Sequence, residues 1–183
     1  MSSHALLSAS SSKRWLNCPP SARLCAEIED TTSEYAKEGT DAHTLCEYKV
    51  KTMLGIEMQD PTETLVYYNE EMERCANDYA CYIMDGLEVI KNYCKDPLVL
   101  IEQKLDFSKY VPEGFGTGDC VIVADKTLYI FDFKYGKGVE VESENNPQMM
   151  CYAVGALELF DSLYDIENVC MIIFQPRIEN ISV

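Results

Sequence analysis

The chain has 183 residues, which suits one domain of ordinary size because folded units usually contain about 100–200 residues. Apolar residues make up 47% of it, enough to bury a continuous core, so a disordered tail is excluded. Lys and Arg total 15 against 31 Asp and Glu, a formal charge of −16. That charge excludes a surface that is basic overall and coats nucleic acid, although a local basic strip or a bound metal could still receive a phosphate.

Apolar runs and cysteines indicate the compartment. No apolar run is long enough to span a bilayer, and the Ser-rich start lacks the apolar segment of a secretory signal. The nine cysteines are an odd number and include no C-x-x-C motif. We therefore expect a cytoplasmic protein, without a membrane partner, whose thiols are mostly small core residues.

Helical periodicity dominates the first half of the chain. Residues 1–31 are interpreted as an N-terminal arm, and 32–183 as one domain because no composition break divides them. Apolar residues recur at helical spacing over 40–54, with Thr40 as N-cap and Gly55 as the stop, and again over 70–94. Both segments are predicted helices.

Strand periodicity dominates the second half. Predicted strands at 98–107, 119–124 and 128–135 precede a helix from 147 to about 160, and a final strand follows at 168–175. A short polar connection makes the second and third strands an antiparallel hairpin, and Asn146 caps the helix that begins at Pro147. The order ααβββαβ predicts an α/β (α+β) fold in which helices flank a mixed central sheet.

The predicted hairpin carries charges on a strand that is otherwise apolar. Because residues two apart on a strand share a face, Asp132 and Lys134 point the same way, and Asp119 begins the neighbouring strand. An isolated D-x-K is most simply a salt-bridged pair near a sheet end. Two carboxylates from adjacent strands can also hold Mg²⁺ or Mn²⁺, with the ammonium stabilising charge on an attacked phosphate.

Polar residues on the two neighbouring helices could complete such a site. His43 lies in the first turn of its predicted helix, and Glu47 follows one turn later on the same face. A lone helical histidine is usually a core or capping residue. Beside two carboxylates, however, a neutral imidazole would complete a metal shell with Glu47 as an orienting group. On the last helix, Gln148 and Tyr152 are neighbours, and core packing explains Tyr152 better than it explains Gln148.

Taken in order, these motifs resemble a known superfamily. A G-T-D-A-H segment opening a helix, Asp119 after a Gly-Thr-Gly, D-x-K at 132–134 and Q-x-x-x-Y at 148–152 are similar to the PD-(D/E)XK nucleases. The branch that is most similar is RecB-like and includes the CRISPR-adaptation exonucleases. The resemblance runs from about Ser8 to the end, and the whole chain is similar to uncharacterised phage and prophage proteins of this type. It implies a restriction-endonuclease-like core.

The resemblance also implies a role for each motif residue. His43, Asp119 and Asp132 would ligate Mg²⁺ or Mn²⁺, and the backbone carbonyl of Phe133 would add a ligand. Lys134 would be the catalytic lysine, acting with the two aspartates on a phosphodiester bond.

Residues outside the D-x-K motif would have supporting roles. Gln148 and Tyr152 would position DNA, and Glu47 and Glu102 would act from outside the metal shell. Cys18, which precedes a Pro pair in the arm, resembles one ligand of a [4Fe–4S] cluster. The other cluster cysteines usually lie after the nuclease core, where this chain has few, so we expect no cluster. The chain would then correspond to the N-terminal part of a longer family architecture, or to a form whose arm survives without a cluster.

Two functions are therefore expected as alternatives. The first is a metal-dependent DNA nuclease, an exonuclease on ends or single strands in phage replication, recombination or defence, located in the bacterial host cytoplasm. The second is a nuclease fold with little or no catalysis that docks a recombinase, a single-strand-binding protein or a defence protein. The acidic composition favours the second, and the joint presence of His43, Asp119, Asp132 and Lys134 favours the first.

Overall fold

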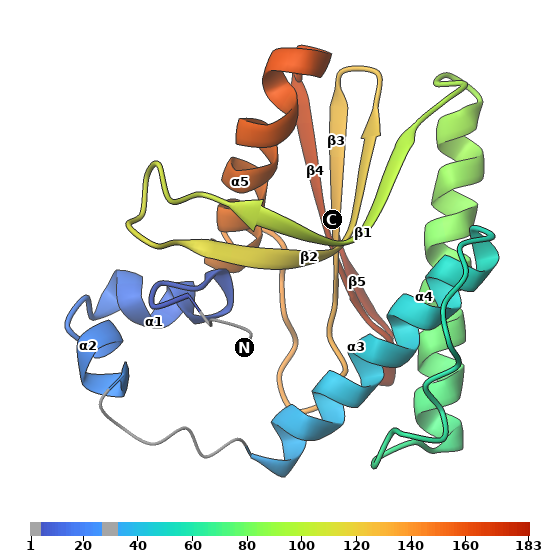
Figure 1. Ribbon diagram of the computed structural model, residues 1–183, viewed down its shortest axis with the longest axis horizontal. Helices are drawn as coiled ribbons and strands as arrows, with labels where there is room; N and C mark the ends of the chain where they lie inside the picture. Colours follow the sequence, from blue (N-terminus) through green and yellow to red (C-terminus); the bar gives the residue numbers. More distant parts are fainter. Residues whose placement is uncertain (1–4, 27–32) are drawn as a thin grey trace.

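The computed structural model describes residues 5–26 and 33–183, which form a mixed α+β fold with helices on both faces of one sheet (Figure 1). The five strands follow the order β1-β2-β3-β4-β5, with β3 and β4 parallel and every other pair antiparallel. The elements are η1 Ala9–Ser11, α1 Ser12–Asn17, α2 Ser21–Ala26, α3 Glu34–Met53, α4 Glu70–Lys91, β1 Leu98–Asp106, β2 Phe115–Ala124, β3 Thr127–Phe133, α5 Pro147–Tyr164, β4 Asn168–Gln175, η2 Pro176–Ile178 and β5 Asn180–Ser182. This arrangement confirms the predicted fold class.

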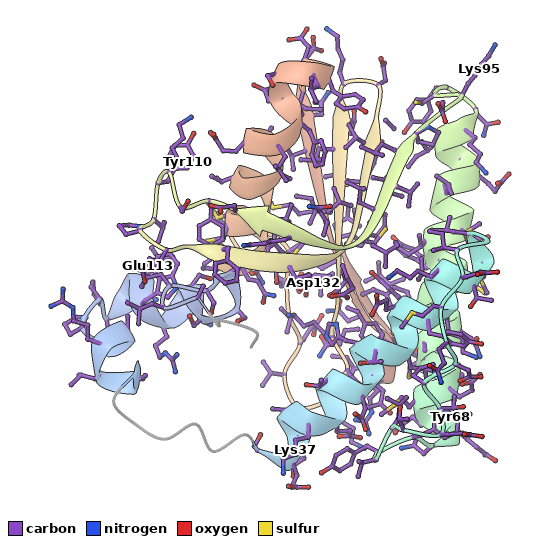
Figure 2. The ribbon with its side chains drawn as sticks, in the orientation of Figure 1. Lys37, Tyr68, Lys95, Tyr110, Glu113 and Asp132 are labelled. Carbon is purple, nitrogen blue, oxygen red and sulfur yellow. The ribbon has the colours of Figure 1, made fainter. Side chains whose placement is uncertain are left out.

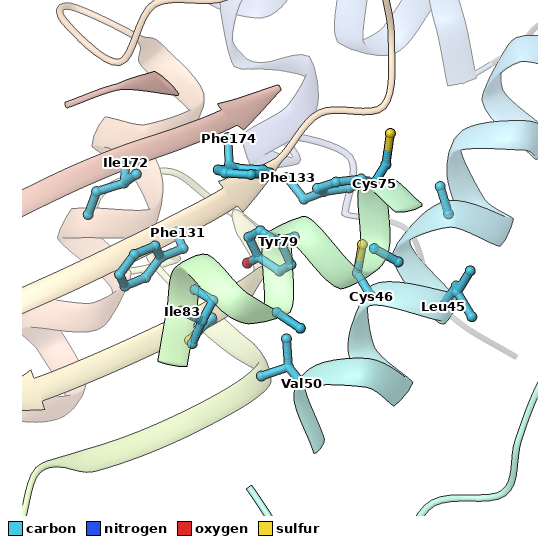
Figure 3. Close-up of a cluster of buried hydrophobic side chains, with 14 of the residues drawn as sticks. Leu45, Cys46, Val50, Cys75, Tyr79, Ile83, Phe131, Phe133, Ile172 and Phe174 are labelled. Atoms are coloured by element: carbon cyan, nitrogen blue, oxygen red, sulfur yellow. The ribbon is translucent and has the colours of Figure 1, made fainter. Parts of the chain in front are cut away.

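One hydrophobic cluster lies between the sheet and the helix pair α3 and α4 (Figure 3). The apolar stripe of α4 reaches the sheet through Tyr79, whose ring centroid lies 5.2 Å from that of Phe133 on β3 and 5.6 Å from that of Phe174 on β4. Burial of such aromatic rings contributes much of the stability of a core. This packing fixes α3, and therefore His43, over one face of the sheet.

A second cluster lies on the opposite face, under α5. Alternation along β3 produces both clusters, because Leu128 and Ile130 face α5 whereas Phe131 and Phe133 face α4. Asn146 caps α5 as predicted, since its side chain accepts hydrogen bonds from the next two free backbone N–H groups. The cap fixes the first turn of α5 beside the end of β3.

The start of α3 differs from the prediction. The helix begins at Glu34 after a Ser33 cap that accepts from the Ala36 N–H, and it continues through Gly39. Thr40 is therefore inside the helix, where its hydroxyl donates to the Ala36 carbonyl. The first turns are exposed and lack an apolar stripe, so periodicity could not reveal them, and a helical glycine costs only about 1 kcal/mol.

The second strand also begins earlier than predicted, at Phe115 in place of Asp119. In this earlier part of the strand, Gly116 leaves room for the Tyr152 ring of α5: a Cβ there would lie 2.6 Å from a ring carbon. Gly116 therefore allows α5 to approach β2 closely. The three-residue β5 was not predicted, because so short a strand shows no alternation.

Strand β1 exchanges its faces in the middle. Ile101 packs against the cluster under α3 and α4, whereas Leu105 belongs to the cluster under α5. On a regular strand, residues four apart would share a face. Glu102 lies between them with a φ of 54°, in the left-handed region, and this backbone turn redirects the strand.

The described part of the N-terminal arm is folded against the domain. Helices η1 and α1 pack on α5, and the Trp15 indole N–H donates to the Ser8 carbonyl over 2.9 Å. The domain boundary predicted after residue 31 lies outside the described residues. None of the helices in 5–26 and 33–183 has the length and apolar composition needed to cross a bilayer.

Candidate functional site

Three potential metal ligands meet between α3 and the first two strands. His43, Glu102 and Asp119 each offer one donor atom, and the three atoms lie within 4.8 Å of one another. We call these residues the donor trio. The strand ladder pairs Ile101 with Cys120 and Gln103 with Gly118, so Glu102 and Asp119 face each other across β1 and β2. Two residues 17 positions apart are thereby held as neighbours by the sheet itself.

Asp119 occupies the place where β2 exchanges faces. A Cβ on Gly118 would lie against Leu105 in the cluster under α5, whereas Cys120 belongs to the cluster under α3 and α4. On a regular strand these two positions would share a face. The exchange on β2 matches that on β1, and it accompanies the approach of the Asp119 carboxylate to His43 on α3.

Two hydrogen bonds hold the Asp119 carboxylate. Oδ1 lies 3.1 Å from His43 Nδ1, and Oδ2 accepts from the Phe133 backbone N–H over 2.6 Å. The ladder between β2 and β3 ends at the pair Cys120 and Phe131, which leaves the Phe133 N–H without a partner on β2. Because this N–H donates to Asp119, the carboxylate also ties the ends of the two strands together.

The charges of the trio are reflected in its pKa values. Burial lowers the pKa of His43, but the Asp119 carboxylate outweighs it and raises the value from 6.5 to about 9. Burial would raise the pKa of Asp119, yet His43 and the Phe133 N–H hold it below its ordinary value. The pKa of Glu102 is raised to about 7, first by burial and then by the charge of Asp119. The trio therefore retains protons in place of a counter-cation.

The donor trio fits a divalent cation. Ligand atoms lie about 2.0–2.5 Å from Mg²⁺, Mn²⁺ or Zn²⁺, so ligands of one ion lie within about 5 Å of one another. One imidazole with two carboxylates is a donor set that Mn²⁺ accepts well and Mg²⁺ accepts through its oxygens. The His43 side chain is 35% exposed and that of Asp119 is 12% exposed, so the set is open to solvent.

A second polar group, the lysine network, lies beside the trio at the end of β3. The Lys134 ammonium lies 2.8 Å from Asp132 Oδ2 and donates to Gln148 Oε1 over 3.0 Å. The Gln148 amide then donates to Asp132 Oδ1 over 3.0 Å and to the Tyr152 hydroxyl over 2.9 Å. Four residues that two motifs place on a strand and a helix are thus joined in one network, in the centre of the molecule where Figure 2 labels Asp132.

Asp132 is the most buried member of this network, with an exposed fraction of 2%. Burial raises the pKa of its carboxyl above the ordinary value, although Lys134 opposes the shift. Among the described residues, Oδ2 accepts no hydrogen bond of good geometry, so only the ion pair with Lys134 satisfies it. The plain interpretation of D-x-K as a salt bridge and the expectation of a functional pair are both compatible with this contact.

The structure groups two residues differently from the sequence expectation, and their roles toward a metal remain predictions. Glu102, expected outside the metal shell, belongs to the donor trio, and Asp132, expected inside it, does not. The physical reason is the left-handed backbone at Glu102, which redirects β1 at that residue, while Asp132 is engaged by Lys134 and Gln148. The only sequence signal for Glu102 was a lone acid in an apolar strand.

The other predicted residues belong neither to the donor trio nor to the lysine network. Glu47 forms an ion pair with Lys51, and its charge contributes to the raised pKa of Glu102. Phe133 joins the site through its N–H, and its carbonyl remains a predicted ligand. Cys18 is exposed, and among the described residues it belongs to no group of three metal-donor side chains.

Comparison with known proteins identifies the family. The solved structure described as "Crystal structure of SSO0001" is similar over 79% of this chain and 76% of that chain, at 16% identity and a TM-score of 0.23, too low to support an argument about fold or function. A family model described as "Protein of unknown function (DUF2800)" matches residues 4–183, nearly the whole chain. The chain therefore belongs to the DUF2800 family.

Proposed function

We propose that this protein is a metal-dependent deoxyribonuclease of the PD-(D/E)XK type that hydrolyses phosphodiester bonds at DNA ends or in single strands, in phage replication, recombination or defence. The observation that carries the proposal is the convergence of the donor trio and the lysine network at one point of the sheet. A scaffold needs neither a solvent-open trio of metal donors nor a buried carboxylate beside an ammonium.

The donor trio would hold Mg²⁺ or Mn²⁺ in this proposal. Such an ion supplies a Lewis acid for a phosphate oxygen and lowers the pKa of bound water. His43, Glu102 and Asp119 would provide the ligands, and the bond from the Phe133 N–H would orient the Asp119 carboxylate. Because the trio retains protons at neutral pH, these side chains must release them when an ion binds.

Lys134 would act on the substrate directly. Its side chain is 25% exposed, so the ammonium is accessible while Asp132 and Gln148 hold it from the buried side. In this position, the ammonium can orient an attacking water and stabilise negative charge that develops on the phosphate. Gln148 would be a positioning residue, because it contacts both the ammonium and the Asp132 carboxylate.

The charge of the protein constrains how DNA would bind. At −16, the molecule as a whole repels phosphates, so capture of DNA should depend on the ion and on Lys134. Binding should therefore be weak in the absence of metal and should weaken further with added salt. A recombinase or a single-strand-binding protein that delivers DNA would compensate for this weakness.

The test is a cleavage assay on end-labelled single-stranded and duplex DNA, circular DNA and RNA, with Mn²⁺, Mg²⁺ or chelator. We expect metal-dependent cleavage of linear DNA that falls about 100–1000-fold in Lys134→Ala, the loss typical of one removed electrostatic contact. Lys95→Ala is the matched control, since Lys95 is exposed and lies far from Asp132 in Figure 2. Unchanged cleavage in Lys134→Ala, or cleavage in chelator, would contradict the proposal.

The acidic surface favours one alternative, a non-catalytic nuclease fold that docks a recombination or defence protein. A net charge of −16 suits association with a basic protein surface better than association with DNA. The same assay separates the two functions, because a docking module would cleave no substrate with either metal. Retained binding of a purified phage recombinase would then support the alternative.

A further inference from the structure

An apolar groove of about 560 Å³ lies between α1, α5 and the loop after β1, on a part of the surface that the proposed function does not use. Its volume is within the range of ligand-binding pockets. It is lined by Trp15, Leu16, Phe107, Tyr110, Val111, Pro147, Met150, Cys151, Val154, Leu157 and Glu158.

The walls of the groove are aliphatic side chains exposed to water. Leu16 is 55% exposed, Met150 is 51% exposed and Val154 is 36% exposed. Of the three aromatic residues in the lining, Trp15 is 9% exposed and Phe107 only 1%, whereas Tyr110 is 59% exposed. A contiguous apolar hollow in a chain this acidic indicates a surface that another molecule covers.

The described part of the arm, which lies beside the groove, is basic, whereas the chain as a whole is acidic. Residues 5–26 contain the basic residues Lys13, Arg14 and Arg23 and no Asp or Glu, whereas the whole chain carries −16. Lys13 and Arg14 are exposed, and neither forms an ion pair within the described residues. They line a second, polar hollow of about 550 Å³ on α1, the same short helix whose Leu16 borders the groove.

We propose that the groove binds an acidic peptide segment of a partner protein, which inserts bulky apolar side chains between α1 and α5 while its carboxylates contact Lys13 and Arg14. Charge complementarity carries the choice of partner, because exposed cations beside an apolar groove attract a segment that combines aliphatic or aromatic side chains with Asp or Glu. The proposal does not depend on nuclease activity, because no residue of the groove belongs to the donor trio or the lysine network.

The lining favours a peptide over a nucleic acid. Single strands bind through several exposed aromatic platforms on which bases stack, but Trp15 and Phe107 are buried, which leaves Tyr110 as the one exposed aromatic ring of the lining. The Tyr110 hydroxyl donates to the Glu158 carboxylate over 2.6 Å, and Lys109 pairs with the same carboxylate. Glu158 therefore places an acid at the groove where a phosphate would have to lie, and the cation nearest to it is already engaged.

The experiment uses fluorescein-labelled synthetic peptides that contain a Leu-Phe pair flanked by aspartates, serines or lysines, together with labelled oligo-dT. Fluorescence anisotropy on the whole chain should show that the aspartate peptide binds at least about tenfold more tightly than the lysine peptide. Added salt should weaken that binding, because exposed charges are screened. Oligo-dT should not displace it.

Two pairs of variants locate the site. Val154→Lys should weaken binding of the aspartate peptide at least about tenfold, whereas Leu163→Lys, at a 76% exposed apolar position of the same helix outside the groove, should not. Reversing charge at both Lys13 and Arg14 should weaken binding, whereas reversing it at both Lys95 and Lys137 should not. Melting curves of each variant verify folding.

Several outcomes would overturn the proposal. One is equal binding of the three peptides, and another is equal binding by Val154→Lys and Leu163→Lys. Displacement of the peptide by oligo-dT would assign the groove to nucleic acid. A dimer of the native chain that dissociates in Val154→Lys would assign the groove to a second copy.

Discussion

The donor trio and the lysine network are two acidic centres at one point of the sheet, and they balance their charge differently. In the lysine network, the Asp132 carboxylate has a permanent cation 2.8 Å away in Lys134. In the donor trio, the two carboxylates lie beside His43, whose pKa is raised to about 9, and Glu102 itself has a pKa raised to about 7. One centre is complete without a ligand, and the other compensates its charge with protons that a metal can replace.

This difference assigns separable tasks to the two centres. Ion binding should depend on the trio, while the placement of an ammonium beside a phosphate should depend on the network.

The largest expected effect is that of Asp119→Asn, which keeps the hydrogen-bonding shape but removes a ligand charge. In the native protein, we expect Mn²⁺ to stabilise the fold by on the order of 1–3 kcal/mol at saturation. Asp119→Asn should abolish this stabilisation and reduce cleavage about 100-fold or more, measured by thermal melting and by the DNA assay.

Asp132→Asn is the control from the other centre. This variant should lose about as much cleavage activity as Asp119→Asn, because Lys134 loses its carboxylate partner. Its melting temperature should still rise with Mn²⁺ nearly as much as that of the native protein. Complete loss of that shift in Asp132→Asn would return Asp132 to the metal shell and would make the separation of tasks wrong.

Glu102→Gln is expected to have the next largest effect. It removes one carboxylate charge from the trio without changing side-chain length, so Mn²⁺ affinity should fall more than the 10–100-fold typical of an outer residue. Without metal, the variant should melt at or above the native temperature, because the repulsion between Glu102 and Asp119 is gone. A loss below tenfold, measured by titration with Mn²⁺, would return Glu102 to the supporting role expected from sequence.

The pH dependence should differ between the metal-free and metal-bound protein. Folding raises the pKa of Glu102 from 4.5 to about 7 and that of His43 from 6.5 to about 9. The folded state therefore binds more protons than the unfolded state. Without metal, the contribution of these two groups to the free energy of unfolding is lost as pH rises through these two intervals. Melting temperatures should fall by a few degrees from pH 6 to 9 without metal.

Mn²⁺ should reverse part of this trend, because the ion requires deprotonated ligands. Its affinity should rise with pH by up to about tenfold per pH unit for each proton released. His43→Gln should remove the pH dependence of Mn²⁺ affinity above pH 7, where His43 is the member of the trio that titrates. An Mn²⁺ shift independent of pH would show that the ion binds outside the trio.

Residue periodicity and helix caps predicted most of the fold, because these signals depend only on residues that are close together in the sequence. Strand β4 was predicted with its observed bounds, and the Asn146 cap with Pro147 located the start of α5 to the residue. The start of α3 was wrong because its first turns are exposed and held by a Ser33 cap, with no apolar stripe to detect. Patterns therefore predicted buried faces well and exposed helix ends poorly.

The candidate site was only partly accessible to the same signals. Period-two alternation placed Asp132 and Lys134 on one face, and helix spacing paired Gln148 with Tyr152. Glu102 could not be placed, because alternation assumes a regular strand and its left-handed φ of 54° breaks that assumption. The residue that departs from the sequence rule is one of the three members of the donor trio.

Tyr152→Phe should have the smallest effect of the series. Among the described residues, the hydroxyl accepts only from Gln148, and Gln148 keeps its contacts with Asp132 and Lys134 when that bond is lost. The ring remains against Gly116, so the free energy of unfolding should fall by only about 0.5–1.5 kcal/mol, and the Mn²⁺ shift should not change. Cleavage should fall less than tenfold, because the hydroxyl is two contacts away from the ammonium.

Gln148→Ala is the matched comparison for Tyr152→Phe, since it removes the donor to Asp132 and the acceptor from Lys134 together. It should reduce cleavage about 10–100-fold, as expected when a positioning partner is lost. Separate measurements of kcat and of KM for the oligonucleotide show whether the Tyr152 hydroxyl acts on the reacting groups or contacts DNA. If Tyr152→Phe loses as much kcat as Gln148→Ala, the hydroxyl acts on the reacting groups themselves. If it raises KM alone, the hydroxyl contacts DNA, and Tyr152 has the DNA-positioning role that the Q-x-x-x-Y motif implies.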